Sequence, residues 1–267
     1  MKITTWNINS VRLRLPSLAR VIKEISPDII CLQETKVRDE LFPVKDIGVL
    51  GYPYQAISGM KGYNGVAILS KRPLLNIKTK AWCNKADCRH VFATINEKGV
   101  GPIEIHNFYV PAGGDIPDPK KNIKFAHKLQ FLKEVSKWQK RRQKNLSAQI
   151  LVGDLNIAPL PTDVWSHKQL LKEVSHTPVE IEALEELRLA GSWTDAVREI
   201  IPPEEPLFSW WSYRSKDYKK NNRGRRLDHI WTTNALKKHI STIDVFNAAR
   251  DWEKPSDHVP ITITLAV

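Results

Sequence analysis

The side chains best suited to chemistry lie where short apolar runs end. Near the end of the chain, Asp257 and His258 stand side by side just before the apolar run 261–265. An aspartate can hold a divalent metal or orient an imidazole, and a histidine can donate to charge that develops on a phosphate. Six more polar residues interrupt apolar runs elsewhere: Asn7, Glu34, Tyr109, Asp154, Asn156 and Asp228. This pattern predicts a hydrolase, and within that class a phosphodiesterase.

Glu34 closes the apolar run 28–33, so its carboxylate is expected at the edge of a sheet. Cleaving a phosphodiester requires a Lewis acid for the non-bridging oxygens, an activated water and stabilisation of the developing charge. Carboxylates with few cysteines or histidines around them favour a hard cation such as Mg²⁺ or Mn²⁺. The alternative is that Glu34 caps a helix or forms a structural salt bridge.

The segment 153–156, Gly-Asp-Leu-Asn, follows the apolar run 149–152. Period-two alternation predicts that Asp154 and Asn156 lie on one face of the continuing chain. A carboxylate and an amide placed together could activate a water and orient a phosphate. The alternative is a simple turn, because Asp and Asn are common turn residues.

Among the eight histidines, His258 is the one predicted to act in catalysis, because of its Asp257 neighbour and its loop position. His229 follows Asp228 at the start of a predicted strand, so we expect a structural or surface residue there. His90 and His106 alternate with apolar neighbours and are also expected to be structural.

A strongly basic segment spans residues 214–226. Such a run is often only a solvated surface. Trp210, Trp211 and Tyr213 immediately precede it, however, and aromatic rings beside cations are what stacking and backbone tracking of nucleic acid require. The segment carries seven cations against the single Asp217: Arg214, Lys216, Lys219, Lys220, Arg223, Arg225 and Arg226.

Composition points to a folded protein with a polyanionic partner. The chain has 267 residues, 42% of them hydrophobic, and a formal net charge of +12. Neutralising phosphates drives most non-specific nucleic-acid affinity, although a basic but ordinary protein is the alternative. Three cysteines are too few for a disulfide framework, no apolar run reaches membrane-spanning length, and the chain opens directly into a predicted strand. We therefore expect a soluble, cytoplasmic protein without a signal peptide.

Strands and helices are predicted to alternate in some places and to follow one another directly in others. Helical periodicity covers residues 14–25, 122–144 and 180–190. The mixture favours a layered α/β sandwich over a doubly wound parallel sheet, and the absence of repeats or linkers predicts one domain, 1–267. Strands are predicted at 2–7, 28–33, 65–70, 90–95, 103–110, 149–153, 227–233, 242–246 and 261–266.

Taken together, these segments resemble the exonuclease III family of the endonuclease/exonuclease/phosphatase superfamily. The matching stretches occur in family order and span residues 2 to 260, nearly the whole chain. The joint signal is specific, although Gly-Asp-Leu-Asn alone would be weak. The stretches are 2–10, 32–36, 61–67, 107–111, 153–157, 208–214, 222–228 and 253–258.

The resemblance implies a four-layer α/β sandwich, in which two packed mixed sheets are flanked by helices. It also implies a metal-dependent enzyme that incises double-stranded DNA 5′ to abasic sites and removes nucleotides 3′ to 5′ from DNA ends. We expect a monomer with no membrane partner.

The resemblance also implies residue roles. Glu34 would bind the metal, with Asn9 and Asp257 nearby, and Asp154 would activate water or protonate the leaving group. Asp228 would orient the His258 imidazole, much as a triad aspartate does. Asn7, Asn156 and Tyr109 would hold the phosphate, and the residues expected to bind substrate are Asn7, Lys61, Asn107, Trp210, Arg214, Arg223 and Arg225.

Two positions depart from the family pattern. Ala112 stands where many relatives carry an amide that contacts DNA, and Arg225 stands where the human relative has a tryptophan of the abasic pocket. Both leave open the balance between exonuclease and abasic endonuclease activity. Trp210 is expected to line the lesion pocket while Trp211 lies in the core; the reverse is the alternative, because adjacent strand residues face opposite ways.

Two other functions fit parts of the sequence. A phosphatase of inositol phosphates or a lipid phosphodiesterase would share the catalytic residues, but the basic, aromatic segment 210–226 argues against it. A catalytically dead nucleic-acid-binding protein would share the charge, but every catalytic position holds a competent residue.

Overall fold

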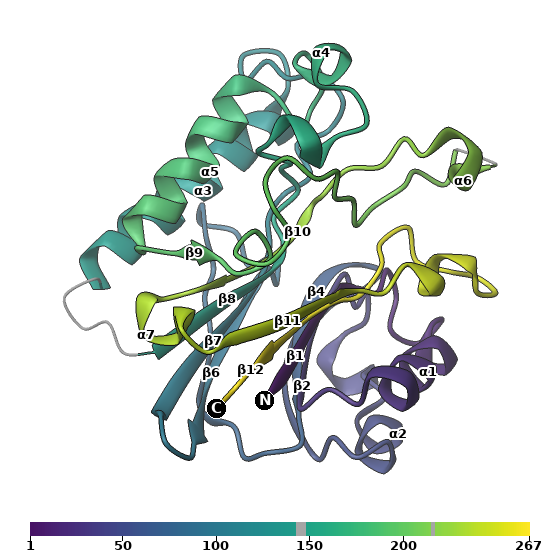
Figure 1. The fold of residues 1–267 in the computed structure, drawn as a ribbon, viewed down its shortest axis with the longest axis vertical. Coiled ribbons are helices and arrows are strands. Elements are labelled where there is room, and N and C mark those ends of the chain that lie inside the picture. Colours follow the sequence, from purple (N-terminus) through teal and green to yellow (C-terminus); the bar gives the residue numbers. More distant parts are fainter. Residues whose placement is uncertain (143–147, 215–216) are drawn as a thin grey trace.

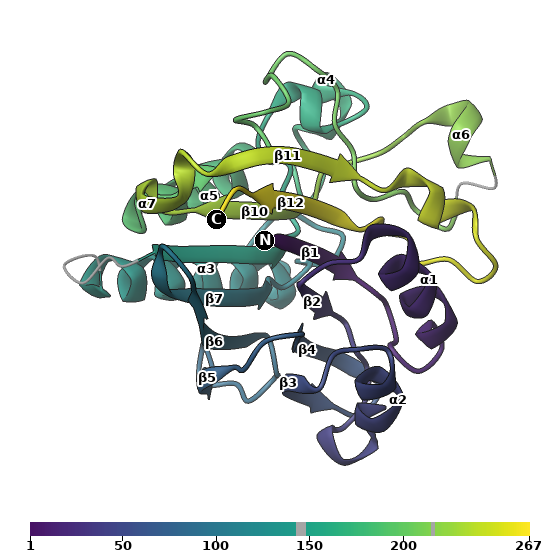
Figure 2. The ribbon, with the colours of Figure 1, turned by 60° about the horizontal axis from the view of Figure 1, so that its bottom comes forward.

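The computed structural model describes residues 1–142, 148–214 and 217–267. Two six-stranded mixed sheets pack face to face (Figures 1 and 2). In spatial order the first sheet comprises β11 (Ile240–Val245), β12 (Ile261–Leu265), β1 (Lys2–Asn7), β2 (Ile29–Gln33), β4 (Tyr63–Ser70) and β3 (Tyr54–Met60). The second comprises β5 (Leu75–Thr79), β6 (His90–Glu97), β7 (Gly101–Tyr109), β8 (Ala148–Asp154), β10 (Asp228–Thr232) and β9 (Thr194–Asp195).

Each sheet contains one parallel pair, β1 with β2 and β7 with β8, and its other neighbours run antiparallel. The central strands β1, β2, β8 and β10 are buried along almost their whole length because both of their faces are covered. In β8, Ile150 and Val152 belong to the core between the sheets, whereas Leu151 packs under the outer helices. This is the behaviour of strands in the middle of a layered α/β fold.

Helices form the two outer layers. On the first sheet lies α1 (Leu15–Ile25), with Leu18 and Val21 packed among Trp6 and Leu32, and α2 (Val44–Val49) adds Ile47 to the same cluster. On the second lie α3 (Ile123–Arg142) and α5 (Pro178–Ala190), whose leucines pack against the outward side chains of β8. The predicted four-layer α/β sandwich is therefore confirmed (Figure 1).

The helix ends follow local chemistry. The helix α1 stops at Ser26, which is left-handed with φ of 52°. The helix α5 begins two residues earlier than predicted, because Pro178 occupies its first turn and Thr177 with Glu180 forms a capping box. The last two residues of the predicted helix 122–144 lie outside the described ranges. The short helices α4 (His167–Leu170), α6 (Tyr218–Asn221) and α7 (Asn234–Lys237) were not predicted.

Three strands were missed by the sequence analysis, and each has a physical reason. The strand β9 is only two residues long, and β5 is an edge strand whose five residues are all exposed, so neither has an apolar pattern. The strand β3 contains Gly59, a residue that is rare inside strands. Across the part of the chain that the structure describes, no helix is long and apolar enough to cross a membrane.

Candidate active site

The predicted chemical residues meet at one end of the sandwich because the strands that carry them end there. Parallel pairing of β1 with β2 brings Asn7 level with Gln33, just before Glu34. In the second sheet, Asp154 pairs with Tyr109 on one side and with Asp228 on the other. His258 stands in the loop that leads into β12, beside β1. Residues far apart in sequence are therefore assembled by strand register.

The Asp228–His258 pair has the geometry of an oriented imidazole. Nδ1 of His258 lies 2.7 Å from Oδ2 of Asp228, and the two side chains are 4% and 0% exposed. The hydroxyl of Ser209 donates to the same carboxylate oxygen at 2.6 Å and accepts from the backbone amide of Asp228. Ser209, which sequence analysis overlooked, thus fixes the carboxylate that fixes the imidazole.

Asp154 faces the other side of this imidazole. Its Oδ2 lies 3.6 Å from Nε2 of His258 and accepts a 2.9 Å hydrogen bond from Asn7, while Oδ1 accepts from the backbone amide of Asn156 at 2.9 Å. Burial raises the pKa of Asp154 to about 7; His258 opposes the rise and Asp228 adds to it. A carboxyl with such a pKa can hold or release a proton near neutrality.

His258 is held in its protonated form. Burial alone would lower its pKa, but the carboxylates of Asp228 and Asp154 and the hydrogen bond to Asp228 raise the pKa to about 10. Asp257 contributes in the same direction. An imidazolium at this position can stabilise negative charge on a phosphate.

Glu34, Asn9 and Asp257 form an oxygen-rich group beside Asp154. Glu34 is linked to Asp154 through Asn7, whose side-chain amide donates to both carboxylates. Asn9 donates to Oδ1 of Asp257 at 3.1 Å. Burial would raise the pKa of Glu34, but Asn7 and Lys36 lower it, so Glu34 is ionised.

A cationic side chain, that of Lys36, already contacts the oxygens of this group. The Lys36 ammonium lies 2.7 Å from Oε2 of Glu34 and 2.5 Å from Oδ1 of Asn9. Carboxylate and amide oxygens that converge on one positive charge are a donor set suited to a hard divalent ion. The residues present therefore fit the predicted metal.

A second acidic group is a competing metal site. Within the described ranges, Asp154, Asp228 and His258 are the three metal-ligating side chains whose ligand atoms all lie within 4.8 Å of one another. We assign this group to proton handling, because Nδ1 of His258 is already bonded to Asp228. The hydroxyl of Tyr109 completes the centre as a neutral donor: burial raises its pKa well above the usual value, with further contributions from Glu34 and Asp154.

Comparison with known proteins identifies the family and the fold. The family model for the endonuclease/exonuclease/phosphatase family matches residues 4–258. The chain belongs to this family. It is 31% identical to exodeoxyribonuclease III of Haemophilus influenzae over 268 residues, covering 98% of each protein.

Solved structures agree. An AP endonuclease from Archaeoglobus fulgidus superposes with a TM-score of 0.88 at 33% identity, with each chain fully covered. The 3′ phosphatase NExo from Neisseria, solved with a product DNA hairpin, gives a TM-score of 0.89 at 29% identity over 99% of both chains. The protein is therefore a nuclease of the endonuclease/exonuclease/phosphatase family.

The structure corrects the predicted placement of Asn156 in this nuclease. The strand β8 ends at Asp154, and Asn156 is left-handed with φ of 55°, so period-two alternation does not continue through the segment. Its side-chain amide donates to the carbonyl of Val110 at 2.9 Å. The turn, which was the alternative interpretation, nevertheless brings Asn156 next to Asp154.

Asn107 does not line the site, contrary to prediction. Its side chain is 0% exposed and its amide donates to the carbonyls of Leu32 and Ala67, while its oxygen accepts from Gln33. These partners belong to the other sheet, so Asn107 links the two sheets inside the core. Its motif was recognised correctly, but its neighbour Tyr109 carries the chemistry.

Trp210 and Trp211 differ in burial, as expected. Trp210 is half-buried and its Nε1 donates to Asp257 at 3.0 Å, whereas Trp211 is buried and donates to Asn222. A cavity of about 290 Å³ opens beside Trp210; its walls are Trp165, Gln169, Leu170, Glu173, Trp210, Ser212, Arg223 and Arg225. The aromatic and cationic side chains predicted to contact DNA therefore meet next to the catalytic centre.

Two arginines stack on the tryptophans of this cavity. The guanidinium of Arg223 lies 4.6 Å from the ring centre of Trp165, and that of Arg225 lies 5.5 Å from Trp210. Of the other predicted substrate residues, Lys61 and Arg214 are exposed. Lys216 lies outside the residues that the structure describes.

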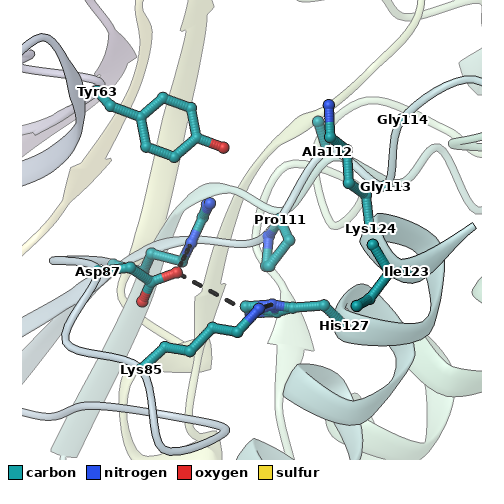
Figure 3. A pocket seen from close by; sticks show the side chains of 11 residues that line it. Tyr63, Lys85, Asp87, Pro111, Ala112, Gly113, Gly114, Ile123, Lys124 and His127 are labelled. Atoms are coloured by element: carbon teal, nitrogen blue, oxygen red, sulfur yellow. Dashed lines mark hydrogen bonds and ion pairs between the residues drawn. The ribbon is translucent and has the colours of Figure 1, made fainter.

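A pocket of about 380 Å³ lies between the loop that follows β7 and the start of α3 (Figure 3). Its inner wall is Arg89, which stacks between Tyr109 at 4.8 Å and Tyr63 at 5.9 Å. Lys85 and Lys124 line the pocket as further cations. Arg89 was not predicted, because its role depends on stacking against residues far from it in sequence.

The histidines predicted to be structural lie in the core. His90 and His106 are buried and stack with aromatic neighbours, and His229 is buried with its Nε2 2.8 Å from the carbonyl of Ile157.

Proposed function

We propose that this nuclease is a divalent-metal-dependent DNA repair phosphodiesterase. It incises DNA 5′ to abasic sites and removes nucleotides 3′ to 5′ from duplex DNA. The observation that carries the proposal is the buried Asp228–His258 pair facing Asp154, beside the oxygen-rich group of Glu34. The net charge of +12 and the tryptophan–arginine cavity support DNA as the substrate.

Glu34, Asn9 and Asp257 would hold Mg²⁺, with Mn²⁺ as a substitute. When bound, the ion supplies a Lewis acid for a non-bridging oxygen of the phosphate. Glu34 is the principal ligand, since its carboxylate is ionised in a buried setting.

The chain's own residues handle the proton and the phosphate. Asp154 either takes a proton from the attacking water or gives one to the leaving oxygen, and Asp228 holds the His258 imidazolium toward the developing charge. Tyr109 and the second N–H of the Asn156 side chain hold the phosphate by donating hydrogen bonds to its oxygens. Asn7, whose two amide protons bind Glu34 and Asp154, would donate to the phosphate by exchanging one of these partners.

The cavity beside Trp210 would receive the abasic sugar. A nucleotide that has lost its base is flipped out of the duplex at low cost. Trp210 offers an apolar wall, and Arg225, held by the carbonyl of Val174 and the hydroxyl of Ser175, closes the cavity where a tryptophan stands in the human relative.

A set of labelled duplexes tests the proposal. The first contains one abasic site, the second is undamaged with a blunt end, and the third ends in a 3′ phosphate, because the Neisseria neighbour is a 3′ phosphatase. Each is incubated with Mg²⁺ and with EDTA. We expect Mg²⁺-dependent cleavage 5′ to the abasic site and shortening from the 3′ end. Cleavage in EDTA, or release of phosphate only from the third duplex, contradicts the proposal.

Glu34→Ala tests the metal assignment. Losing one hard oxygen ligand should raise the Mg²⁺ concentration required for half-maximal activity. Glu24→Ala, on the exposed face of α1, is the control. An unchanged Mg²⁺ requirement would make Glu34 a structural residue.

The protein is proposed to act as a monomer in a reducing compartment, the cytoplasm. Every proposed catalytic residue comes from one chain, and all three cysteines are free. Light scattering with and without a DNA duplex tests the oligomeric state.

A further inference from the structure

A fully buried ion pair lies behind the active site and has no part in the mechanism above. Lys128 of α3 and Glu180 of α5 are both 0% exposed, and Nζ of Lys128 lies 2.5 Å from Oε1 of Glu180. Taking two charges out of water is costly, and a hydrophobic pair of similar volume is often as stable. The pair must therefore be understood through its other hydrogen bonds.

The ammonium of Lys128 has three protons and three acceptors. Besides Glu180, it donates to the carbonyl of Asn156 at 2.8 Å and to that of Ala112 at 3.3 Å. These carbonyls belong to the loops that follow β8 and β7, the two strands that deliver Asp154 and Tyr109. The Lys128 side chain thus hydrogen-bonds to both of these loops of the second sheet.

Glu180 hydrogen-bonds to a third loop, the one that leads into α5. Its carboxylate accepts from the backbone amides of Ser175 and Thr177, and from the hydroxyl of Thr177 at 2.6 Å. The carbonyl of Ser175 in turn accepts from the amide of Ala158, two residues beyond Asn156. The pair is therefore connected to the Asn156 turn from both sides.

The Asn156 turn needs such support. Its backbone is left-handed, with φ of 55°, a conformation that asparagine tolerates, so the demand comes from its buried polar groups. A buried carbonyl without a partner would be costly, and Lys128 supplies that partner. The backbone N–H of Asn156 and one proton of its side-chain NH₂ are used by Asp154 and Val110, and its backbone carbonyl is used by Lys128. The second proton of the NH₂ remains for the phosphate.

We propose that Lys128 and Glu180 form a positioning pair that sets Asn156 against the reacting phosphate. The inference rests on the proposed role of Asn156 in holding that phosphate. The pair touches no substrate; it acts by fixing the turn that carries Asn156. A displacement of about 1 Å at such a residue can cost on the order of 10²-fold in rate.

The test is a double-mutant cycle between the pair and Asn156. Lys128→Met combined with Glu180→Gln removes the buried charges together, so that neither is left unpaired. We expect kcat on the abasic duplex to fall by about 10- to 100-fold with DNA affinity within about twofold of wild type. In an Asn156→Ala background the same two changes should have almost no further effect on kcat, because their effect passes through Asn156.

Two more variants keep the test decisive. Glu180→Asp keeps both charges but shortens the carboxylate side chain, so it covers the case in which the double replacement does not fold; its loss of kcat should vanish in the Asn156→Ala background as well. Arg72→Met is the control. Arg72 pairs with Glu97, which lies beside the start of β7, whereas Tyr109 lies at the other end of that strand, so the change should leave kcat unchanged. Melting temperatures are recorded for every variant, and assays are run well below the lowest.

The positioning role would be overturned if the pair replacement lowered kcat in the Asn156→Ala background by the same factor as in the wild-type background. It would also be overturned if the Lys128→Met/Glu180→Gln variant kept the wild-type kcat. A wild-type kcat in Asn156→Ala alone would instead refute the role proposed for Asn156. The single and combined variants therefore separate the two failures.

Discussion

At the scale of single residues, the proposed catalytic centre is distinguished by charges buried next to their partners. Asp154, Asp228 and His258 are at most 4% exposed, and each charge is set against another within 3.6 Å. Burial gives every interaction here more weight than it would have in water, because the local dielectric constant is lower. Small chemical changes should therefore have large effects on rate.

Asp154→Asn and His258→Asn should each lower turnover by about 10²- to 10⁴-fold, the usual contribution of general acid–base groups. DNA affinity should stay roughly at the wild-type level, since these groups act mainly in the transition state. Single-turnover rates and equilibrium binding to the abasic duplex measure the two quantities separately. A variant that kept more than half of the wild-type rate would disprove the role of the residue changed.

Trp210 should sense the lesion. Trp210→Ala should lower abasic-site incision far more than 3′-to-5′ removal from an undamaged blunt end, because only the abasic sugar enters the cavity. Trp210→Phe separates two contributions, since it keeps an apolar ring and loses the hydrogen bond to Asp257. Equal loss of both activities, with a lowered melting temperature, would identify Trp210 as a core residue.

Sequence reasoning selected candidate residues from their position next to strands, such as Asp154 at the end of β8 and His258 just before β12, and the structure brings these two side chains together. It misplaced Asn107, since a motif does not reveal which side chain of a strand faces the opposite sheet. The structural roles of Ser209 and Lys128 could not be predicted from the sequence for a different reason. Their partners lie 19 and 28 or more residues away, at Asp228, Asn156 and Glu180, and only tertiary packing brings them together.

At the scale of elements, the proposed catalytic side chains lie at or next to strand ends, while most of the side chains proposed to bind DNA stand on loops. Regular apolar runs predicted the central strands well. The edge strand β5 and the two-residue β9 have no such signal, since edge position and pairing partner are properties of the sheet. The basic segment after Tyr213 was predicted from composition, and its short helix α6 carries Lys219 and Lys220.

Replacing Lys219 and Lys220 with Ala should weaken binding to intact and abasic duplexes to a similar extent, because phosphate contacts carry no lesion information. The slope of log K against log salt should become shallower by about 0.9 for each phosphate that is no longer neutralised. Lys219 also forms an exposed ion pair with Asp251, so Asp251→Ala controls for the removal of that pair. An unaltered slope would mean that both lysines are merely solvated.

At the scale of the whole molecule, buried neutral histidines link stability to pH. Burial lowers the pKa of His229 to about 4 from the usual 6.5, and it lowers the pKa of His90 well below 6.5. The unfolded chain therefore binds protons at a higher pH than the folded one. The stability these groups contribute is complete above pH 6.5 and is lost as pH falls toward the folded pKa.

Between pH 6.5 and pH 4, His229 should contribute a loss of about 3 kcal/mol in the free energy of unfolding. The raised pKa of Asp154 acts in the opposite direction, because the folded protein binds that proton at a higher pH than the unfolded chain does, so the His229 contribution is the difference between wild type and a His229 variant. His258 does not offset this loss, because its raised pKa keeps it protonated in both states below pH 6.5. Denaturant titrations across this range measure the slope. His229→Gln keeps a donor for the carbonyl of Ile157. It should lower the slope of the free energy of unfolding against pH by the equivalent of about one bound proton, whereas His239→Gln, at an exposed position, should leave the slope unchanged.

The first and last strands of the chain are neighbours in the middle of one sheet: β1 pairs with β12, and the amino group of Met1 donates to the carbonyl of Leu265. During synthesis β1 leaves the ribosome first and must wait for β12. Asp257 and His258 also emerge late, so a nascent or prematurely terminated chain has neither a closed sheet nor a complete catalytic centre. Such a chain would expose the edge of β1 that β12 covers in the complete fold, but it would lack the residues proposed to cut DNA.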